Sequence, residues 1–351
     1  MNLEIYKHKK VFITGHTGFK GSWMSLWLKK LNAEIVGYSL PPQTLPNHFD
    51  LLNLDIASHF ENICNLEILK KTIKASNPEI IFHLAAQPLV RESYLFPVET
   101  YQTNVMGTIN LMEAARHCDS VKVIVIITTD KCYENKEQLS GYKETDRMGG
   151  FDPYSSSKGC VELVASSYRN SFFNINDYKR THEVLVATVR AGNVIGGGDW
   201  SKDRLIPDLI RAASKGDATK IRFPNATRPW QHVLEPLSGY LMLGKKLLEG
   251  DKTFSGPWNF GPEEKQVISV GEVLNLASKY WHKIRYEEEN SSQLLHEAGL
   301  LSLNIDKAKL KLGWKPLWNN QITIQKTIEW YKSFYESKVL LSEEQLNLYI
   351  N

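Results

Sequence analysis

The chain has 351 residues, of which 42% are hydrophobic and 23% are charged, a balance that predicts a globular protein with a large core. The net charge of +3 is small and the basic residues are scattered, which excludes an extended surface for nucleic acid or an anionic membrane. The four cysteines form no CxxC pair, so we expect neither a metal site nor a disulfide framework. Because the N-terminal segment lacks a signal-peptide core and no stretch approaches ~20 uninterrupted apolar residues, we expect a cytoplasmic protein.

Residues 1–194 alternate short apolar runs with helical patterns. The apolar runs lie at 10–15, 33–40, 78–85, 121–128 and 182–189. Helical spacing of apolar residues occurs between them at 21–31, 66–76, 102–117 and 153–171. Strands of continuous apolar character that alternate with helices are typical of a parallel sheet covered on both faces. The sequence therefore predicts an α/β fold with a doubly wound parallel sheet of the Rossmann type.

From residue 195 onward the pattern changes to shorter, mixed elements. Helical patterns lie at 204–214, 235–250 and 269–281, and strand-like runs lie at 220–225 and 258–261. We expect a second, smaller α/β domain, formed by residues 195–229 and 263–351, that binds the substrate. The segment from about 230 to 262 is expected to return to the first domain. Aromatic residues at 328–338 are expected to pack in the core or at an interface.

Three glycines in GHTGFKG, residues 15–21, have the spacing GxxGxxG between the first predicted strand and the first predicted helix. Glycines at such a turn let the backbone approach a pyrophosphate, and the N-terminus of the following helix offers unpaired N–H groups. This placement predicts a dinucleotide site. The residues expected to contact the cofactor are Gly15, Thr17, Gly18, Phe19, Lys20 and Gly21.

The end of the second predicted strand, GYSL at 37–40, lacks the acidic residue that commonly binds the adenosine ribose of NAD. It also lacks a cation for the 2′-phosphate of NADP, because no Arg or Lys occurs between Gly37 and Asn47. The sequence therefore favours NAD over NADP. Ser39 is expected to serve the ribose hydroxyls, and an ordinary surface serine is the alternative.

A phenol and an amine lie four residues apart in YSSSK, on one face of the helix predicted to begin near Pro153. An ammonium stabilises phenolate, so we expect Lys158 to lower the pKa of Tyr154 until Tyr154 can take the proton of a substrate alcohol. Thr129 ends a strand and should emerge at the carboxyl edge of the sheet, where ligands bind. We therefore expect Thr129, Tyr154 and Lys158 to converge, although a solvated turn and a surface Tyr–Lys pair are the alternatives.

Five longer motifs occur in order between about residues 8 and 335: GHTGFKGSW, TTDKCYEN, GGFDPYSSSK, RAGNVIGGGDW with DRLIP, and RPWQHVLEP. Together they resemble the motifs of the CDP-glucose 4,6-dehydratases, which belong to the extended short-chain dehydrogenase/reductase superfamily. The resemblance implies a bound NAD that is reduced and reoxidised in one turnover, while CDP-glucose loses water to give CDP-4-keto-6-deoxyglucose. It also implies a role in deoxysugar biosynthesis for lipopolysaccharide O-antigen.

The resemblance further implies that Asp130 is the acid toward the C6 hydroxyl and that Lys131 is the base at C5, unless Lys131 only orients a water. The related dTDP-glucose and GDP-mannose dehydratases carry Glu at the second position, so Lys131 favours a CDP-sugar. A nucleotide-sugar 4-epimerase needs only the Thr/Tyr/Lys set. It is one alternative, and a dehydratase for another nucleotide sugar and a non-catalytic NAD-binding protein are others.

Other positions are implied by the same resemblance. The residues expected beside the cofactor are Ala85, Ala86, Gln87 and Asn104, of which Asn104 lies where the superfamily has a structural asparagine. Those expected at the substrate diphosphate and sugar are Asn193, Arg204 and Arg228. Close packing is the alternative for the alanines, and surface ion pairs are the alternative for the last three residues. The helices that begin near Thr100 and Pro153 carry more apolar positions than one core face needs, and superfamily members pair through them. We therefore expect a homodimer with a four-helix interface.

Overall fold

The computed structural model describes residues 1–138, 140–221, 223–263, 267–288 and 301–351. Its centre is a seven-stranded sheet in the order β11-β6-β5-β4-β1-β2-β3, in which every neighbouring pair is parallel. The strands are β1 (Lys10–Thr14), β2 (Glu34–Ser39), β3 (Ala57–Phe60), β4 (Ile80–His83), β5 (Val123–Ile127), β6 (Leu185–Arg190) and β11 (Gly256–Asn259). The strand order reverses between β1 and β4, so ligands are expected at the carboxyl ends there.

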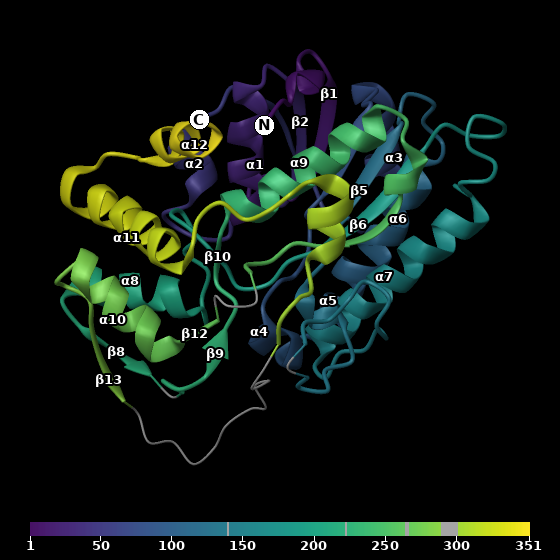
Figure 1. The fold of residues 1–351 in the computed structure, drawn as a ribbon. Helices are drawn as coiled ribbons and strands as arrows, with labels where there is room; N and C mark the ends of the chain where they lie inside the picture. The colour runs from purple at the N-terminus through teal and green to yellow at the C-terminus, as the bar shows by residue number, and fades with distance from the viewer. Residues whose placement is uncertain (139, 222, 264–266, 289–300) are drawn as a thin grey trace.

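Helices cover both faces of this sheet (Figure 1). They are α1 (Phe19–Lys30) and α9 (Leu234–Leu248) on one face, and α3 (Leu66–Ser76), α6 (Gly107–Ala115) and α7 (Pro153–Ser171) on the other. Side chains of β1 alternate between the two cores, since Val11 and Ile13 pack in the first core and Phe12 packs in the second. The predicted doubly wound α/β fold is confirmed.

The five predicted strands are confirmed as β1, β2, β4, β5 and β6. The sequence did not predict β3, because it is an edge strand with mostly exposed side chains and no apolar run. β11 begins two residues before the strand-like run at 258–261. The helix predicted at 102–117 contains a π-helical turn, η2 (Gln102–Met106), between α5 (Pro97–Tyr101) and α6.

A group of smaller elements lies beyond the sheet (Figure 1). Three strand pairs occur there: β7 (Val194–Ile195) with β10 (Gln231–His232), β8 (Ala218–Ile221) with β13 (Arg285–Glu288), and β9 (Thr227–Arg228) with β12 (Ile268–Ser269). The helices are α8 (Leu205–Lys215), α10 (Val270–Tyr280) and α11 (Asn320–Ser337). The exact division into two domains remains a proposal. Within the described part of the chain, each helix is too short or too polar to cross a membrane.

Aromatic side chains of α11 pack beneath the loop GGGDW, residues 196–200. A Cβ at Gly197 would lie 2.0 Å from the ring of Trp330, so only glycine fits there. The Tyr331 hydroxyl donates to the Asp199 carbonyl at 2.5 Å and accepts from the Asp199 N–H at 2.9 Å. The core packing expected of these aromatics is confirmed, and it holds the loop in place.

The helix α12 (Ser342–Ile350) packs against α1. The ring of Tyr349 lies edge-on to that of Trp27, with 5.7 Å between centroids. The Tyr349 hydroxyl donates to the buried Glu235 carboxylate of α9 at 2.7 Å, and the same carboxylate accepts the backbone N–H groups of Leu317 and Trp318. α12 therefore belongs to the layer that covers the main sheet, although the sequence placed residues 263–351 in the smaller domain.

Candidate active site

A cavity of about 1610 Å³ opens between the carboxyl ends of the sheet strands and the smaller elements. With one exception, every residue predicted from the sequence to bind cofactor or substrate, or to act in catalysis, lines this cavity. The exception is Asn104, which is buried and accepts the N–H of Gln87 at 2.8 Å while its amide donates to Ser157 at 2.8 Å. Asn104 thus holds Gln87, which does line the cavity, as a structural asparagine would.

The glycine-rich turn forms one end of the cavity. Gly15 has a φ of +73°, and a Cβ there would lie 2.6 Å from the backbone nitrogen of Ala85. A Cβ at Gly21 would lie 2.0 Å from the Gly15 carbonyl oxygen, so the turn has room for glycine alone. Gly18 is the N-cap of α1, and no side chain caps the first N–H groups of this helix, so they are available to a ligand. The residues present therefore fit the pyrophosphate of a dinucleotide.

The side chain of Ser39 lies at the end of β2 and shares a 2.9 Å hydrogen bond with Thr17. Thr17 also donates to the Leu40 carbonyl at 2.9 Å, so the hydroxyl pair is held in place. Asn62 and Ile63 line the cavity beside them and were missed, because they follow the unpredicted strand β3. A predicted strand at β3 would have placed them at the carboxyl edge of the sheet.

Thr129, Tyr154 and Lys158 come together in the cavity as expected, and all three are less than a tenth exposed. Thr129 lies two residues after the end of β5. Tyr154 and Lys158 lie one turn apart in α7. Asp152 caps α7 by accepting the Ser155 N–H at 2.9 Å, which fixes where this turn begins. The Lys158 amine donates to the Ile127 carbonyl at 3.2 Å.

Burial shifts the pKa of Tyr154 and that of Lys158 in opposite directions. Burial raises the pKa of Tyr154 to about 12, although the hydrogen bond with Thr129 and the charge of Arg204 oppose this. Burial also lowers the pKa of Lys158 to about 8. In this structure burial outweighs the opposing charge of Arg204, and the expectation that Lys158 lowers the pKa of Tyr154 stays a prediction.

The carboxyl of Asp130 is buried beside the reacting groups. It accepts the Thr129 hydroxyl at 2.9 Å and the Asn193 amide at 3.4 Å. A Cβ at Gly192 would lie 1.8 Å from its Oδ2, so glycine allows this close approach. Burial raises the pKa of Asp130, although the charge of Lys131 and the Thr129 hydrogen bond oppose the shift. Such a carboxyl can hold a proton and donate it.

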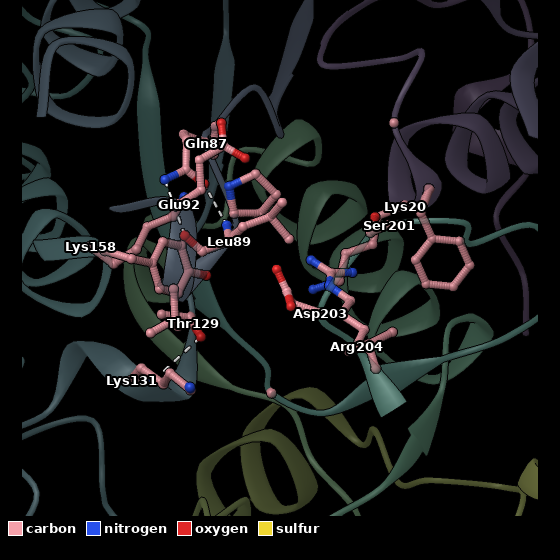
Figure 2. A pocket seen from close by; sticks show the side chains of 18 of the residues that line it. Lys20, Gln87, Leu89, Glu92, Thr129, Lys131, Lys158, Ser201, Asp203 and Arg204 are labelled. Carbon is pink, nitrogen blue, oxygen red and sulfur yellow. Dashed lines mark hydrogen bonds between the residues drawn. The ribbon is translucent and has the colours of Figure 1, made fainter. Parts of the chain in front are cut away.

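The cavity has two walls that carry different groups (Figure 2). Thr129, Lys131 and Lys158 lie on one side, and Lys20 and Arg204 lie on the other. Lys131 is exposed, whereas burial and then the charges of Arg204 and Lys158 lower the pKa of Lys20 to about 7. The amine of Lys20 thus lies among the charged groups of the site, as well as in the glycine-rich turn.

Arg204 is held by Asp199 at 2.9 Å and is one-third exposed, so its remaining N–H groups face the cavity. Arg228 donates to the Thr227 carbonyl at 2.8 Å and also lines the cavity. A second pair, Arg91 with Asp203 at 2.9 Å, joins α4 (Val90–Leu95) to the loop before α8. Arg91 was missed by the sequence reasoning, since no motif marks it.

A seven-stranded parallel sheet, a glycine-rich turn and a Thr/Tyr/Lys set at its carboxyl edge define the class of extended short-chain dehydrogenases/reductases. The chain belongs to the GDP-mannose 4,6 dehydratase family, whose profile matches residues 12–327, and the predicted kinship with the 4,6-dehydratases is confirmed. It is 46% identical to CDP-glucose 4,6-dehydratase of Salmonella typhimurium, over 99% of this chain and 97% of the relative.

More distant relatives and solved structures agree on the fold. The chain is 24% identical to UDP-glucose 4-epimerase of Mycoplasma pneumoniae, over 93% of this chain and 97% of the relative. A UDP-glucose 4-epimerase structure from Thermotoga maritima, solved with UDP-glucose, matches with a TM-score of 0.78 and 20% identity, over 93% of this chain and 99% of that one. MoeE5 in complex with UDP-glucose and NAD matches with a TM-score of 0.74 and 23% identity, over 92% and 98%.

Proposed function

We propose that this protein is an NAD-dependent dehydratase that converts CDP-glucose to CDP-4-dehydro-6-deoxyglucose. The 46% identity to the Salmonella typhimurium CDP-glucose 4,6-dehydratase over nearly the whole chain supports this substrate. The buried carboxyl of Asp130, in contact with Thr129, is the structural observation that favours dehydration. Such a carboxyl supplies the acid that elimination of water needs, and an epimerase has no use for it.

NAD would be held by the glycine-rich turn, by Ser39 with Thr17, and by the cavity residues Ala85, Ala86 and Gln87. When bound it supplies a hydride acceptor for C4 of the sugar and a hydride donor for C6 later in the same turnover. The absence of Arg and Lys from residues 37–47 supports NAD over NADP.

The residues of this chain would act in two groups. Tyr154 takes the proton of the C4 hydroxyl, while Thr129 hydrogen-bonds the same oxygen and the Lys158 ammonium favours the phenolate. Once C4 is a carbonyl, the C5 hydrogen becomes acidic. Lys131, or a water that it orients, takes this proton, and Asp130 protonates the C6 hydroxyl so that water leaves and a C5–C6 double bond forms.

Three side chains would bind the substrate outside the reacting sugar carbons. Arg204 and Arg228 line the cavity from the smaller elements, and guanidinium groups suit the diphosphate. Asn193 contacts Asp130 and would orient the sugar beside it. We also propose the domain division given above, with residues 195–229 and most of 263–351 forming the substrate side.

Assembly as a homodimer is a further proposal. Apolar side chains are exposed on α4, α5, η2 and α7, where Leu95, Val98, Met106 and Leu163 are between 48% and 73% exposed. These elements contact one another, which supports a shared apolar surface that a second copy would cover. Light scattering should give about twice 40.1 kDa, and Leu163→Glu should give the monomer mass. A wild-type monomer at micromolar concentration would contradict the proposal.

The substrate test uses four nucleotide sugars. Purified protein is incubated with CDP-, dTDP-, UDP- and GDP-hexoses, and products are analysed by mass for loss of one water. We expect loss of water from CDP-glucose. Unchanged mass with a new sugar configuration would indicate a 4-epimerase, and no reaction would indicate a non-catalytic NAD-binding protein.

The role of Lys131 is tested with Lys131→Ala in heavy water. This variant should incorporate less deuterium at C5 than the wild type. We also propose a cytoplasmic location and a role in O-antigen deoxysugar biosynthesis.

A further inference from the structure

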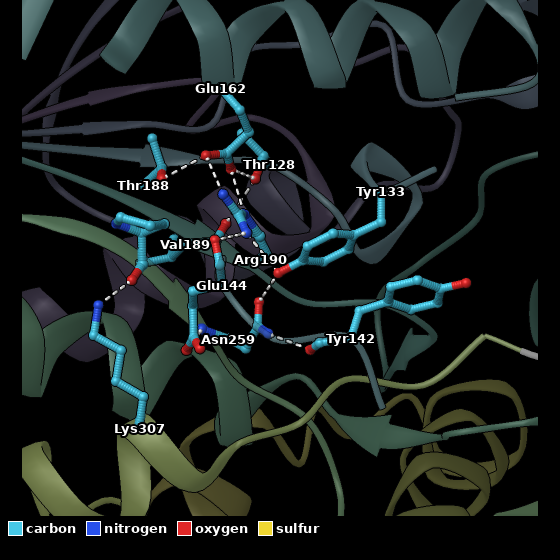
Figure 3. A network of polar contacts seen from close by, with 11 residues as sticks. Thr128, Tyr133, Tyr142, Glu144, Glu162, Thr188, Val189, Arg190, Asn259 and Lys307 are labelled. Atoms are coloured by element: carbon cyan, nitrogen blue, oxygen red, sulfur yellow. Dashed lines mark hydrogen bonds and ion pairs between the residues drawn. The ribbon is translucent and has the colours of Figure 1, made fainter. Parts of the chain in front are cut away.

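A buried polar network lies behind the active site (Figure 3); Thr128 and Tyr133 of this network line the cavity, whereas its central pair, Glu162 and Arg190, does not. Its centre is Glu162 of α7, which is almost fully buried beside Arg190 of β6. The Glu162 Oε1 accepts Thr128 at 2.5 Å and Arg190 Nε at 2.9 Å, and its Oε2 accepts Thr188 at 2.7 Å and Arg190 Nη2 at 2.8 Å. All four contacts occupy the carboxylate, so Glu162 cannot itself touch a substrate.

The same network continues toward the loop that follows the reacting residues. Arg190 Nη1 donates to the Tyr133 hydroxyl at 2.5 Å, and Tyr133 donates to Asn259 at 2.8 Å. The guanidinium of Arg190 also lies 4.8 Å above the Tyr133 ring. Tyr133 comes directly after the turn η3 (Asp130–Cys132), so the network contacts the chain on both sides of that turn.

Two residues of α7, one helical turn apart, contact consecutive residues at the end of β5. Lys158 donates to the Ile127 carbonyl at 3.2 Å, and Glu162 accepts the Thr128 hydroxyl at 2.5 Å. The next residue along the chain is Thr129. The position of the Thr129 hydroxyl and of the Asp130 carboxyl therefore depends on both contacts.

Among the titratable groups that act on the Lys158 amine, Glu162 is the one that is negatively charged near pH 7. The titratable groups that face it are Glu162 of α7, Cys132 of η3, His83 of β4 and Lys20 of α1. Burial raises the pKa of Cys132 well above its usual value and lowers that of His83 to about 3, so both are neutral near pH 7. Burial opposes charge on Glu162, but the Arg190 charge and the hydrogen bonds lower its pKa, so Glu162 stays ionised.

We propose that Glu162 is a positioning residue for the reaction, which anchors the strand end carrying Thr129 and Asp130 and supplies an anion one helical turn from Lys158 in α7. A buried ion pair is in itself weak support for a stabilising role, and the four contacts to one carboxylate at the strand end point to orientation instead. The kcat measurements below rest on the proposed function, because they need turnover of CDP-glucose, whereas the labelling measurement does not.

The first test separates charge from structure with Glu162→Gln. Without the anion the pKa of Lys158 should fall. As pH rises, the variant should therefore lose activity at a lower pH than the wild type does. We expect the alkaline limb of kcat to move down by about one pH unit. Glu113→Gln, which breaks a surface pair with Arg116, is the matched control. A uniform loss of kcat at every pH, with the limb unmoved, would refute the charge part of the proposal.

A second readout needs no substrate. The rate at which a small acylating reagent labels Lys158, followed by peptide mass analysis against pH, reports the pKa of this amine in the protein as purified. The pKa should be lower in Glu162→Gln than in the wild type, and equal values would overturn the proposal. If the wild type does not dehydrate CDP-glucose, this readout still decides the role of Glu162. Should Glu162→Gln unfold, Glu162→Gln/Arg190→Gln removes both charges and carries the same expectation.

The anchoring of the strand end by Glu162 is tested separately, with a substitution at Thr128. Thr128→Val keeps the charge of Glu162 but removes its contact to the strand end, so kcat should fall about tenfold while the alkaline limb stays in place. Thr128→Ser restores the hydroxyl and should restore kcat. Full kcat in Thr128→Val would refute the anchoring role.

Discussion

The two walls of the cavity are built in different ways. The sheet wall, formed by Thr129, Asp130, Tyr154 and Lys158, is buried and held by hydrogen bonds from the strand end and α7. The loop wall, formed by Asn193, Arg204 and Arg228, is partly exposed, and Arg204 is held by one ion pair. Proton transfer needs groups within hydrogen-bond reach in a fixed geometry, whereas recognition of a diphosphate tolerates long side chains that adjust. Substitutions in the sheet wall should therefore affect kcat, and substitutions in the loop wall should affect KM.

The largest effect is expected for Tyr154→Phe in the sheet wall. Without the phenol nothing accepts the C4 hydroxyl proton, so formation of reduced cofactor in a single turnover should slow about a thousandfold. Absorbance of the reduced nicotinamide measures this, and Tyr101→Phe, on the exposed face of α5, is the control. A near-normal rate would remove Tyr154 from the first half of the reaction.

A smaller effect is expected for Asp130→Asn. The amide keeps the size of the side chain but cannot donate a carboxyl proton, so loss of water should slow about a hundredfold while C4 oxidation continues. Reduced cofactor should then accumulate on the enzyme, which distinguishes this variant from Tyr154→Phe. Asp119→Asn, at an exposed turn, is the control. Dehydration at the wild-type rate without such accumulation would show that Asp130 is not the acid.

Arg204→Met tests the loop wall. A charge-assisted hydrogen bond contributes roughly 1.5–3 kcal/mol, so KM for CDP-glucose should rise about tenfold or more with a smaller change in kcat. Steady-state kinetics measure both constants, and Arg116→Met, at the C-cap of α6, is the control. If kcat falls and KM does not, the two walls do not divide the work as proposed.

The smallest effect concerns pH. The Lys20 ammonium is present below its pKa of about 7 and is lost as pH rises through that value, so its attraction for a pyrophosphate should weaken above about pH 7. A partly screened charge contributes about 1 kcal/mol, which predicts about a fivefold fall in NAD affinity between acid and alkaline conditions. Calorimetry on nucleotide-free protein measures it. Lys20→Met should show a flat profile, and an equally steep profile in this variant would exclude Lys20.

The sequence was most informative about the sheet wall. Continuous apolar strands and the GxxGxxG turn predicted the order of elements, and the convergence of Thr129, Tyr154 and Lys158 follows from the fold alone. β3 was not predicted, because an exposed edge strand carries no apolar run. Asn62, which follows β3, was missed for the same reason. The pKa of Tyr154 could not be predicted, because it depends on how far the fold buries the phenol and on Arg204, which is distant in sequence.

The loop wall was predictable only through resemblance to a family. Arg204 and Asn193 occur in motifs, but Arg91 occurs in none, and its partner Asp203 lies 112 residues further along the chain. Glu162 was visible as a residue of a predicted helix, yet nothing in the pattern shows that it would meet Arg190. Long-range pairs of this kind are decided by the packing of α7 on the sheet.

The contact between α12 and α1 has a consequence for synthesis of the chain on the ribosome. α1 emerges early, but the ring of Trp27 gains Tyr349 as a neighbour only after residues 342–350 have been made. β11, an edge strand of the main sheet, also comes late. The nascent nucleotide-binding half therefore carries uncovered apolar surface on α1 until the end of translation, and an unpaired β6 edge until residues 256–259 have been made. We expect chaperones that bind such surfaces to recognise it.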